Sequence, residues 1–152
     1  MYGTHYTIGT DSALHRIIES IDSISTTAFS HQRCFIVEVM GRACGYLGLC
    51  AAIATGADWV FLPECPPSAG WENNLVKTIK KRRNQGDRFS LIIVSEGAMD
   101  ENGKTIECKK IQQIITTSLD IETRISVLGH VQRGGVFIVS HIHIRYHQHM
   151  TE

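Results

Sequence analysis

Hydrophobic and polar residues follow two periodic patterns along this chain. In the first part, leucines and isoleucines recur at the three- and four-residue spacing of one helix face. This spacing predicts a helix over residues 10–28, with Thr10 and Asp11 able to cap its start. Short apolar runs bounded by turn residues predict buried strands. The apolar positions of the first helix are Leu14, Ile17, Ile18, Ile21 and Ile24.

Helix and strand patterns alternate over the rest of the chain. We predict strands over residues 34–40, 59–62, 89–95 and 124–128. We predict further helices in an Ala- and Leu-rich segment that ends at Gly56, over residues 71–85 and over residues 109–118. This alternation, with short connections, is typical of the α/β class: a parallel sheet with helices on both faces, in three layers.

The composition fits one globular domain. The chain has 152 residues, of which 43% are hydrophobic and 20% charged. Its 15 basic and 15 acidic side chains give a formal net charge of zero, which argues against nucleic-acid and anionic-membrane partners. No apolar run approaches the ~18 residues of a spanning helix, and the first residues do not resemble a signal peptide. We therefore expect a cytoplasmic protein.

The cysteines support the same compartment. They number five, an odd count, and follow neither a disulfide nor a zinc spacing. Such usage predicts buried or half-buried thiols in a reducing environment. They are Cys34, Cys44, Cys50, Cys65 and Cys108.

Two groups of basic residues each allow a structural and a functional interpretation. The run at 80–83 ends the helix predicted over 71–85, and we favour a solvated last turn stabilised by the helix dipole. Residues 136–152 differ in composition from the rest because they are rich in histidine. Within them, His141 and His143 could form a metal pair on one strand face. We favour a disordered tail with no packed role, because no carboxylate or cysteine completes a site. The tail's histidines are His141, His143, His147 and His149.

Polar residues and glycines follow three of the predicted strands. These ends read Met40-Gly41-Arg42, Ser95-Glu96-Gly97 and, for residues 129–135, GHVQRGG, whereas Pro63-Glu64-Cys65 is less distinctive. In an open parallel sheet, ligands bind beyond the carboxyl ends of the strands. Guanidinium and imidazole groups suit a phosphate, and a carboxylate suits sugar hydroxyls. The three ends together therefore indicate a phosphosugar site.

Each strand end also has a purely structural interpretation. Gly41 and Arg42 could form a turn with a surface arginine, and Glu96 could begin an ordinary acidic loop. His130 could be a hydrogen-bonded core histidine. The coincidence of all three ends on one sheet edge is what favours the functional interpretation.

Several of these segments resemble ATP-dependent 6-phosphofructokinase. The resemblance runs from about Gly3 to Gly135, and residues 56–61 and 63–67 resemble the N-terminal half of the long eukaryotic form. It implies a phosphofructokinase-like substrate-binding lobe over residues 1–135 and a tail over 136–152 that is foreign to the family. The motifs are TIGTDSAL at 7–14, VEVMGR at 37–42, ETR at 122–124 and VLGHVQRGG at 127–135.

The resemblance also implies roles for individual residues in binding fructose 6-phosphate. Four residues would hold the sugar, and His130 and Arg133 would bind its 6-phosphate. Arg33 and Arg124 would reach that phosphate from a neighbouring subunit of a homo-oligomer, which is a tetramer in the family. The implied substrate-binding set is Met40, Gly41, Arg42, Glu96, His130, Val131, Gln132 and Arg133.

Strand geometry bears on the last two arginines independently. Arg33 precedes its strand and lies roughly 20–25 Å from Gly41, at about 3.3 Å per residue. Arg124 lies about 15 Å or more from Gly129 on the same estimate. Neither should reach the sugar-phosphate site of its own subunit. Without the resemblance, both would be ordinary surface arginines.

The family transfers the γ-phosphoryl group of ATP to fructose 6-phosphate with Mg²⁺, using an aspartate base. That aspartate and the ATP loops would lie upstream of residue 1. We therefore expect no catalytic residue, metal ligand or bound cofactor in this chain, and no activity from it alone. The main hypothesis is a 6-phosphofructokinase fragment that keeps its sugar-phosphate site. The alternatives are a non-catalytic sugar-phosphate-binding or regulatory module that associates with full-length subunits and, least favoured, a metal-binding protein that uses the tail.

Overall fold

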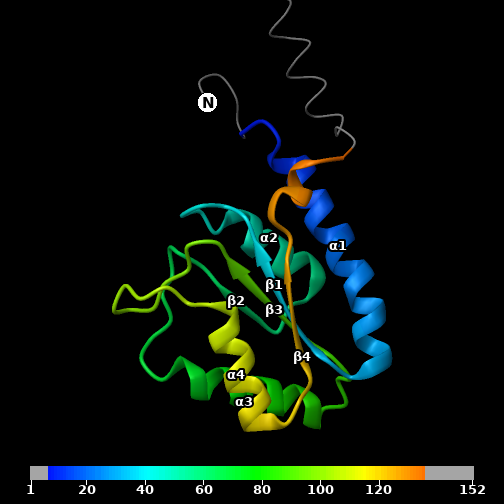
Figure 1. Cartoon of the computed structure of the whole chain (residues 1–152), viewed down its shortest axis with the longest axis vertical. Helices are drawn as coiled ribbons and strands as arrows, with labels where there is room; N and C mark the ends of the chain where they lie inside the picture. The colour runs from blue at the N-terminus through cyan, green and yellow to red at the C-terminus, as the bar shows by residue number, and fades with distance from the viewer. Residues whose placement is uncertain (1–6, 136–152) are drawn as a thin grey trace, which may run out of the picture.

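The computed structural model describes residues 7–135 and shows a parallel sheet between two pairs of helices (Figure 1). Helices and strands alternate, as the periodicity predicts. The helices are α1 (Thr10–His31), α2 (Tyr46–Thr55), α3 (Trp71–Asn84) and α4 (Cys108–Leu119). The strands are β1 (Cys34–Val39), β2 (Trp59–Phe61), β3 (Ser90–Ser95) and β4 (Thr123–Val127), and a 3₁₀ helix, η1 (Gly129–Arg133), follows β4.

The order of strands across the sheet is β2-β3-β1-β4, and every pairing is parallel. In register, Cys34 of β1 lies between Ser90 of β3 and Thr123 of β4. The central strands are therefore β3 and β1. All strands point the same way, so the loops that follow them gather at one edge of the sheet.

Two hydrophobic cores fill the space on either side of the sheet. On β1, Cys34 and Ile36 face the core shared with α3 and α4, whereas Val37 and Val39 face the core shared with α1 and α2. Because successive side chains of a strand point to opposite faces, one apolar strand serves both cores. The predicted three-layer α/β fold is confirmed.

The observed ends of the elements differ from the predicted ones by a few residues. Helix α1 runs three residues beyond 28 and is followed by Gln32 in the left-handed conformation (φ 54°). Its N-cap is Gly9, with no side-chain cap, so the predicted capping by Thr10 and Asp11 is wrong. Gly56 ends α2 as predicted, with φ 65°. The turn η1 was missed because five residues are too few to show a helical period.

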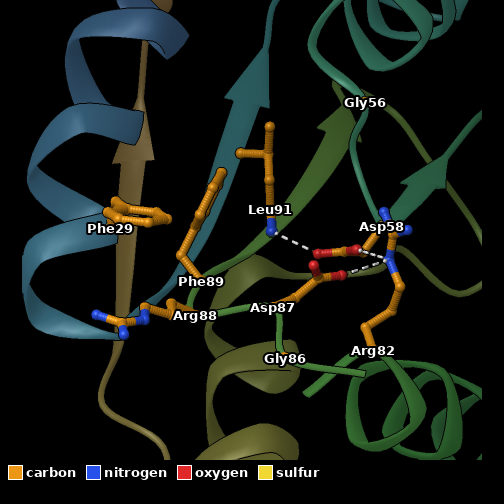
Figure 2. Close-up of a pocket in the computed structure, with 9 residues that line it drawn as sticks. All are labelled: Phe29, Gly56, Asp58, Arg82, Gly86, Asp87, Arg88, Phe89 and Leu91. Carbon is orange, nitrogen blue, oxygen red and sulfur yellow. Dashed lines mark hydrogen bonds and ion pairs between the residues drawn. The ribbon is translucent and has the colours of Figure 1, made fainter. Parts of the chain in front are cut away.

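The basic end of α3 is not simply solvated, which corrects the favoured interpretation. Arg82 Nε donates to Asp58 Oδ1 at 2.6 Å, and Leu91 N donates to Asp58 Oδ2 at 2.9 Å (Figure 2). The Asp58 side chain is only 6% exposed, and a carboxylate so buried needs such partners. Arg83 donates to the carbonyl of Gln32 at 2.8 Å. The two arginines thus join α3 to β2, β3 and the end of α1.

The cysteines range from buried to exposed, with Cys50 half-buried, so the prediction of buried or half-buried thiols is wrong for two of the five. Cys34 and Cys108 are buried in the sheet core, and burial raises the pKa of each thiol to about 12. Cys44 and Cys65 are exposed. They lie in the loops that follow β1 and β2, which have too little chain around them to cover a side chain.

Two further expectations concern membrane-spanning helices and the histidine-rich tail. No helix within residues 7–135 is both long enough and apolar enough to cross a membrane. The histidine-rich tail, with its possible metal pair, lies outside the described residues.

Candidate sugar-phosphate site

A crevice is expected where the helices that follow neighbouring strands leave on opposite faces of the sheet. Strand β1 continues into α2, which packs on one face, and β3 continues into α4, which packs on the other. Since β1 and β3 are neighbours, their carboxyl ends form this switch point. The segments Met40-Gly41-Arg42 and Glu96-Gly97 meet there.

Glu96 joins the two strand ends. Its Oε2 accepts hydrogen bonds from the backbone N–H groups of Gly41, at 3.0 Å, and Arg42, at 2.9 Å. These bonds, with smaller contributions from the charges of Arg42 and Arg133, hold the pKa of Glu96 below its usual range. Glu96 is therefore an ionised carboxylate at neutral pH, whose remaining lone pairs can accept hydrogen bonds from sugar hydroxyls.

The two glycines of this site allow close backbone approach. A side chain at Gly97, whose φ is +80°, would place its Cβ 2.6 Å from the carbonyl oxygen of Arg42. A Cβ at Gly41 would overlap the carbonyl oxygen of Cys44. Arg42 itself takes the left-handed conformation, with φ 53°, which is uncommon for a residue other than glycine. The loop after β1 thus has a specific shape that its side chains alone would not favour.

Gln132 forms a second bridge, between η1 and the end of β1. Its Oε1 accepts a hydrogen bond from Met40 N at 3.0 Å, and its Nε2 donates to Met40 O at 3.1 Å. The residue is 2% exposed. A glutamine at this position therefore satisfies both backbone polar groups of Met40 without water.

His130 and Arg133 lie on the same side of η1. In a 3₁₀ helix, residues three apart eclipse one another, so a His-x-x-Arg spacing aligns the two cationic side chains. Both are exposed, which excludes the interpretation of His130 as a core histidine. Val131, between them, is 67% exposed and belongs to neither core.

A cavity connects most of these groups. Its walls include Met40, Gly41 and Arg42 from the loop after β1, and Gln132 and Arg133 from η1. The segment 7–10, which leads into α1, closes one side; no site role was predicted for it. The start of α1 and η1 lie next to each other in Figure 1. Only the tertiary structure brings these distant segments together.

Glu64 supports the loop after β1 from outside the cavity, and the sequence predicted no role for it. Both of its carboxylate oxygens accept from Gly45 N, at 2.8 and 3.0 Å. That bond is the main reason why the pKa of Glu64 lies below its usual range, with a smaller contribution from the Cys44 thiol. Glu64 thereby holds the far end of the loop after β1, where α2 begins. The helix dipole also stabilises a negative charge at this position. Its place after a strand end was the only available signal.

Arg33 and Arg124 lie at the opposite edge of the sheet. Arg33 directly precedes β1, and Arg124 is the register partner of Phe35 in that strand. Arg33 Nε donates to Glu122 at 2.7 Å, and Arg124 pairs with the other oxygen of the same carboxylate. Both sit at the amino ends of their strands, away from Glu96 and η1.

The described residues show no metal centre. Within residues 7–135, no group of three or more His, Cys, Asp or Glu side chains could hold a metal ion.

A polar site at the switch point of an open parallel sheet is typical of ligand-binding α/β enzymes. The sequence model of the family described as Phosphofructokinase matches residues 1–141. The muscle-type ATP-dependent 6-phosphofructokinase of Canis lupus familiaris is 57% identical over 133 residues, which cover 88% of this chain and 17% of the dog protein. The liver-type enzyme of Bos taurus is 56% identical with the same coverage of each chain. The chain belongs to the phosphofructokinase family.

A solved structure supports the same assignment. Phosphofructokinase from Saccharomyces cerevisiae is similar with a TM-score of 0.91 and 42% identity, over 97% of this chain and 20% of the yeast chain. The predicted resemblance to phosphofructokinase is confirmed. The chain spans about a sixth of the length of the curated relatives it matches, 17% in each case.

Proposed function

We propose that this chain supplies the fructose 6-phosphate site of an ATP-dependent 6-phosphofructokinase. The observation that carries the proposal is the meeting of Glu96 with the backbone of Gly41 and Arg42 at the β1–β3 switch point. Relatives named ATP-dependent 6-phosphofructokinase, 56–57% identical over the same segment, support the choice of substrate.

The two halves of the site suit the two ends of that ligand. Met40, Gly41, Arg42 and Glu96 provide backbone groups and an ionised carboxylate for the sugar hydroxyls. His130 and Arg133 provide an aligned imidazole and guanidinium for the 6-phosphate. Fructose 6-phosphate would lie across the crevice, with its phosphate toward η1.

We assign no contact with ATP or Mg²⁺ to residues 7–135. This part of the chain would bind and orient the phosphoryl acceptor.

Arg33 and Arg124 complete the proposal as contacts in trans. Their position at the amino edge places them away from the crevice of their own subunit. Glu122 pairs with both, so the two guanidinium groups are held together and present a joint positive charge. They would bind the 6-phosphate held by a neighbouring subunit of a homo-oligomer.

Calorimetric titration of fructose 6-phosphate into the 152-residue chain tests the site. We expect millimolar binding, and we expect Arg133→Ala to weaken it by about 10- to 100-fold, because a charge-assisted contact contributes about 1.5–3 kcal/mol. Arg88→Ala is the matched control, since Arg88 is an exposed arginine that stacks on Phe29 in another pocket (Figure 2). Binding that Arg133→Ala leaves unchanged would show that the phosphate lies elsewhere.

A further inference from the structure

We propose that Gln132 is a positioning residue that sets the spacing between the sugar-binding loop (residues 40–42) and the phosphate-binding turn η1, and that it makes no polar contact with the ligand. The inference rests on the proposed function and deepens it. It also reassigns Gln132, which the family resemblance places among the substrate contacts.

The first support is that both polar atoms of the Gln132 amide bind Met40 while the residue is buried. The carbonyl oxygen accepts from Met40 N at 3.0 Å and the amide nitrogen donates to Met40 O at 3.1 Å. Gln132 forms part of the cavity wall, yet it is 2% exposed and both ends of its amide bind Met40. One N–H and one oxygen lone pair of the amide are not used by Met40, but burial covers them, so a ligand could reach them only if Gln132 moved and the pair with Met40 was disturbed.

The second support is the position of the pair between the two halves of the site. Met40 directly precedes Gly41 and Arg42, and Gln132 lies between His130 and Arg133. The bridged residues are 92 positions apart in the chain. Outside the site, the backbone N–H of Leu128 also donates to Glu38 O at 3.1 Å and anchors the start of η1 to β1. The Gln132–Met40 pair fixes the end of η1 that carries Arg133.

The third support is that each half has its own internal geometry. His130 and Arg133 share one 3₁₀ turn, so their mutual spacing does not depend on Gln132. Glu96 holds Gly41 and Arg42 by separate hydrogen bonds. Loss of the bridge should therefore weaken only ligands that engage both halves at once, because the second contact gains its strength from correct placement.

The test compares fructose 6-phosphate with inorganic phosphate on the 152-residue chain. In Gln132→Met, which keeps the length of the side chain and removes both hydrogen bonds, we expect about a tenfold loss of affinity for fructose 6-phosphate. Affinity for inorganic phosphate at η1, followed by the NMR shifts of Arg133 so that binding at the Arg33–Arg124 pair is not counted, should change by less than about twofold. Amide hydrogen exchange at Met40 should become faster in the absence of any ligand.

Gln112→Met is the matched control. Gln112 Nε2 also donates to a strand carbonyl, that of Thr123, at 2.7 Å, but at the other edge of the sheet. It should leave the affinities for both ligands and the exchange of Met40 unchanged. If it lowers affinity as Gln132→Met does, the effect is one of general stability and the inference fails.

The remaining outcomes are decisive too. Equal losses of affinity for both ligands would mean that Gln132 contacts the phosphate directly, and the inference would fail. Faster exchange at Met40 with unchanged affinities would mean that the Gln132–Met40 hydrogen bonds do not set the spacing of the two halves. Unchanged hydrogen exchange at Met40 in Gln132→Met would show that Gln132 does not bond to Met40 in solution. If the unaltered chain binds neither ligand, the proposed function fails and the inference fails with it, a result separate from all the others.

Discussion

Arg33, which directly precedes β1, and Arg124, the second residue of β4, both pair with one carboxylate. Glu122 accepts from Arg33 through one oxygen and from Arg124 through the other. The hydrogen bond from Arg33 lowers the pKa of Glu122 most, and that from Arg124 lowers it further. The carboxylate is therefore ionised when it binds the two guanidinium groups. The cluster has two positive charges against one negative and remains attractive to a phosphate.

If a full-length 6-phosphofructokinase that contains this segment uses the proposed contacts in trans, Arg33→Ala and Arg124→Ala should each raise its KM for fructose 6-phosphate about tenfold or more. The physical reason is loss of a charge-assisted phosphate contact made across a subunit interface. Steady-state kinetics on each variant would measure the change.

Mixed oligomers separate a contact in trans from one in cis. Combining either variant with Arg133→Ala should restore some intact sites, because the two lesions then lie in different subunits. Subunit exchange must be verified by mass spectrometry. No recovery of activity after verified exchange would place these arginines outside the neighbouring site.

Replacement of Glu96 should produce a pH-dependent loss of stability. Its pKa is lowered in the folded chain from the ordinary value of 4.5, mainly by the N–H groups of Gly41 and Arg42. A lowered pKa stabilises the fold above the unfolded value and ceases to do so as the pH falls through the folded value. Glu96→Gln should therefore unfold at lower urea than the unaltered chain at pH 7, and the difference should shrink below about pH 4.5.

The control for this experiment is Glu101→Gln, a carboxylate in the exposed turn between β3 and α4. Glu101→Gln should leave the urea midpoint unchanged at both pH 7 and pH 3. A Glu96→Gln difference that persists undiminished at pH 3 would show that packing, and not ionisation, explains the effect.

Helix α2 approaches β3 closely at Gly48, where a larger residue requires the Ser95 side chain to move. A Cβ there would overlap Ser95 Oγ, a buried hydroxyl with no hydrogen-bond partner among residues 7–135. Gly48→Ala should cost about 1–3 kcal/mol of unfolding free energy. Ser95→Ala should recover much of this loss, because it removes the overlapping oxygen and leaves a Cβ contact of 3.4 Å.

Urea unfolding of both single variants and of the double variant measures the coupling. Gly56→Ala is a useful comparison, since a Cβ there meets no atom within 4 Å and only the φ of +65° opposes it. It should cost about 1 kcal/mol and should not be rescued by Ser95→Ala. Strict additivity of Gly48→Ala and Ser95→Ala would contradict the contact.

Alkylation should distinguish the cysteines in order of burial. Cys44 and Cys65 are exposed and should react first with iodoacetamide at pH 8. Cys34 and Cys108 are buried with pKa values of about 12, so only about one thiol in 10⁴ would be ionised at that pH. Peptide mass spectrometry over time would show this order, and it should disappear in urea. Early modification of Cys34 would contradict its place in the core.

The sequence alone determined the α/β class, because the spacing of hydrophobic residues differs between helices and strands. This spacing is a local property, as the four-residue separation of Ile17 and Ile21 in the first helix shows. It also placed Arg42, Glu96 and His130 at strand ends, since a strand end is a local event marked by glycine and polar residues. The family resemblance added roles to these positions. It could not show that Gln132 binds Met40.

The tertiary structure decided the rest, because strand order is not written in any local pattern. The sheet could have separated β1 from β3, whereas the observed order β2-β3-β1-β4 makes them neighbours and brings Glu96 to Gly41. The contacts of Glu64 and of Gln132 are likewise hydrogen bonds between segments distant in the chain, 19 and 92 residues apart. Such bonds depend on where whole elements pack, since the burial of apolar faces and the pairing of strands set their positions.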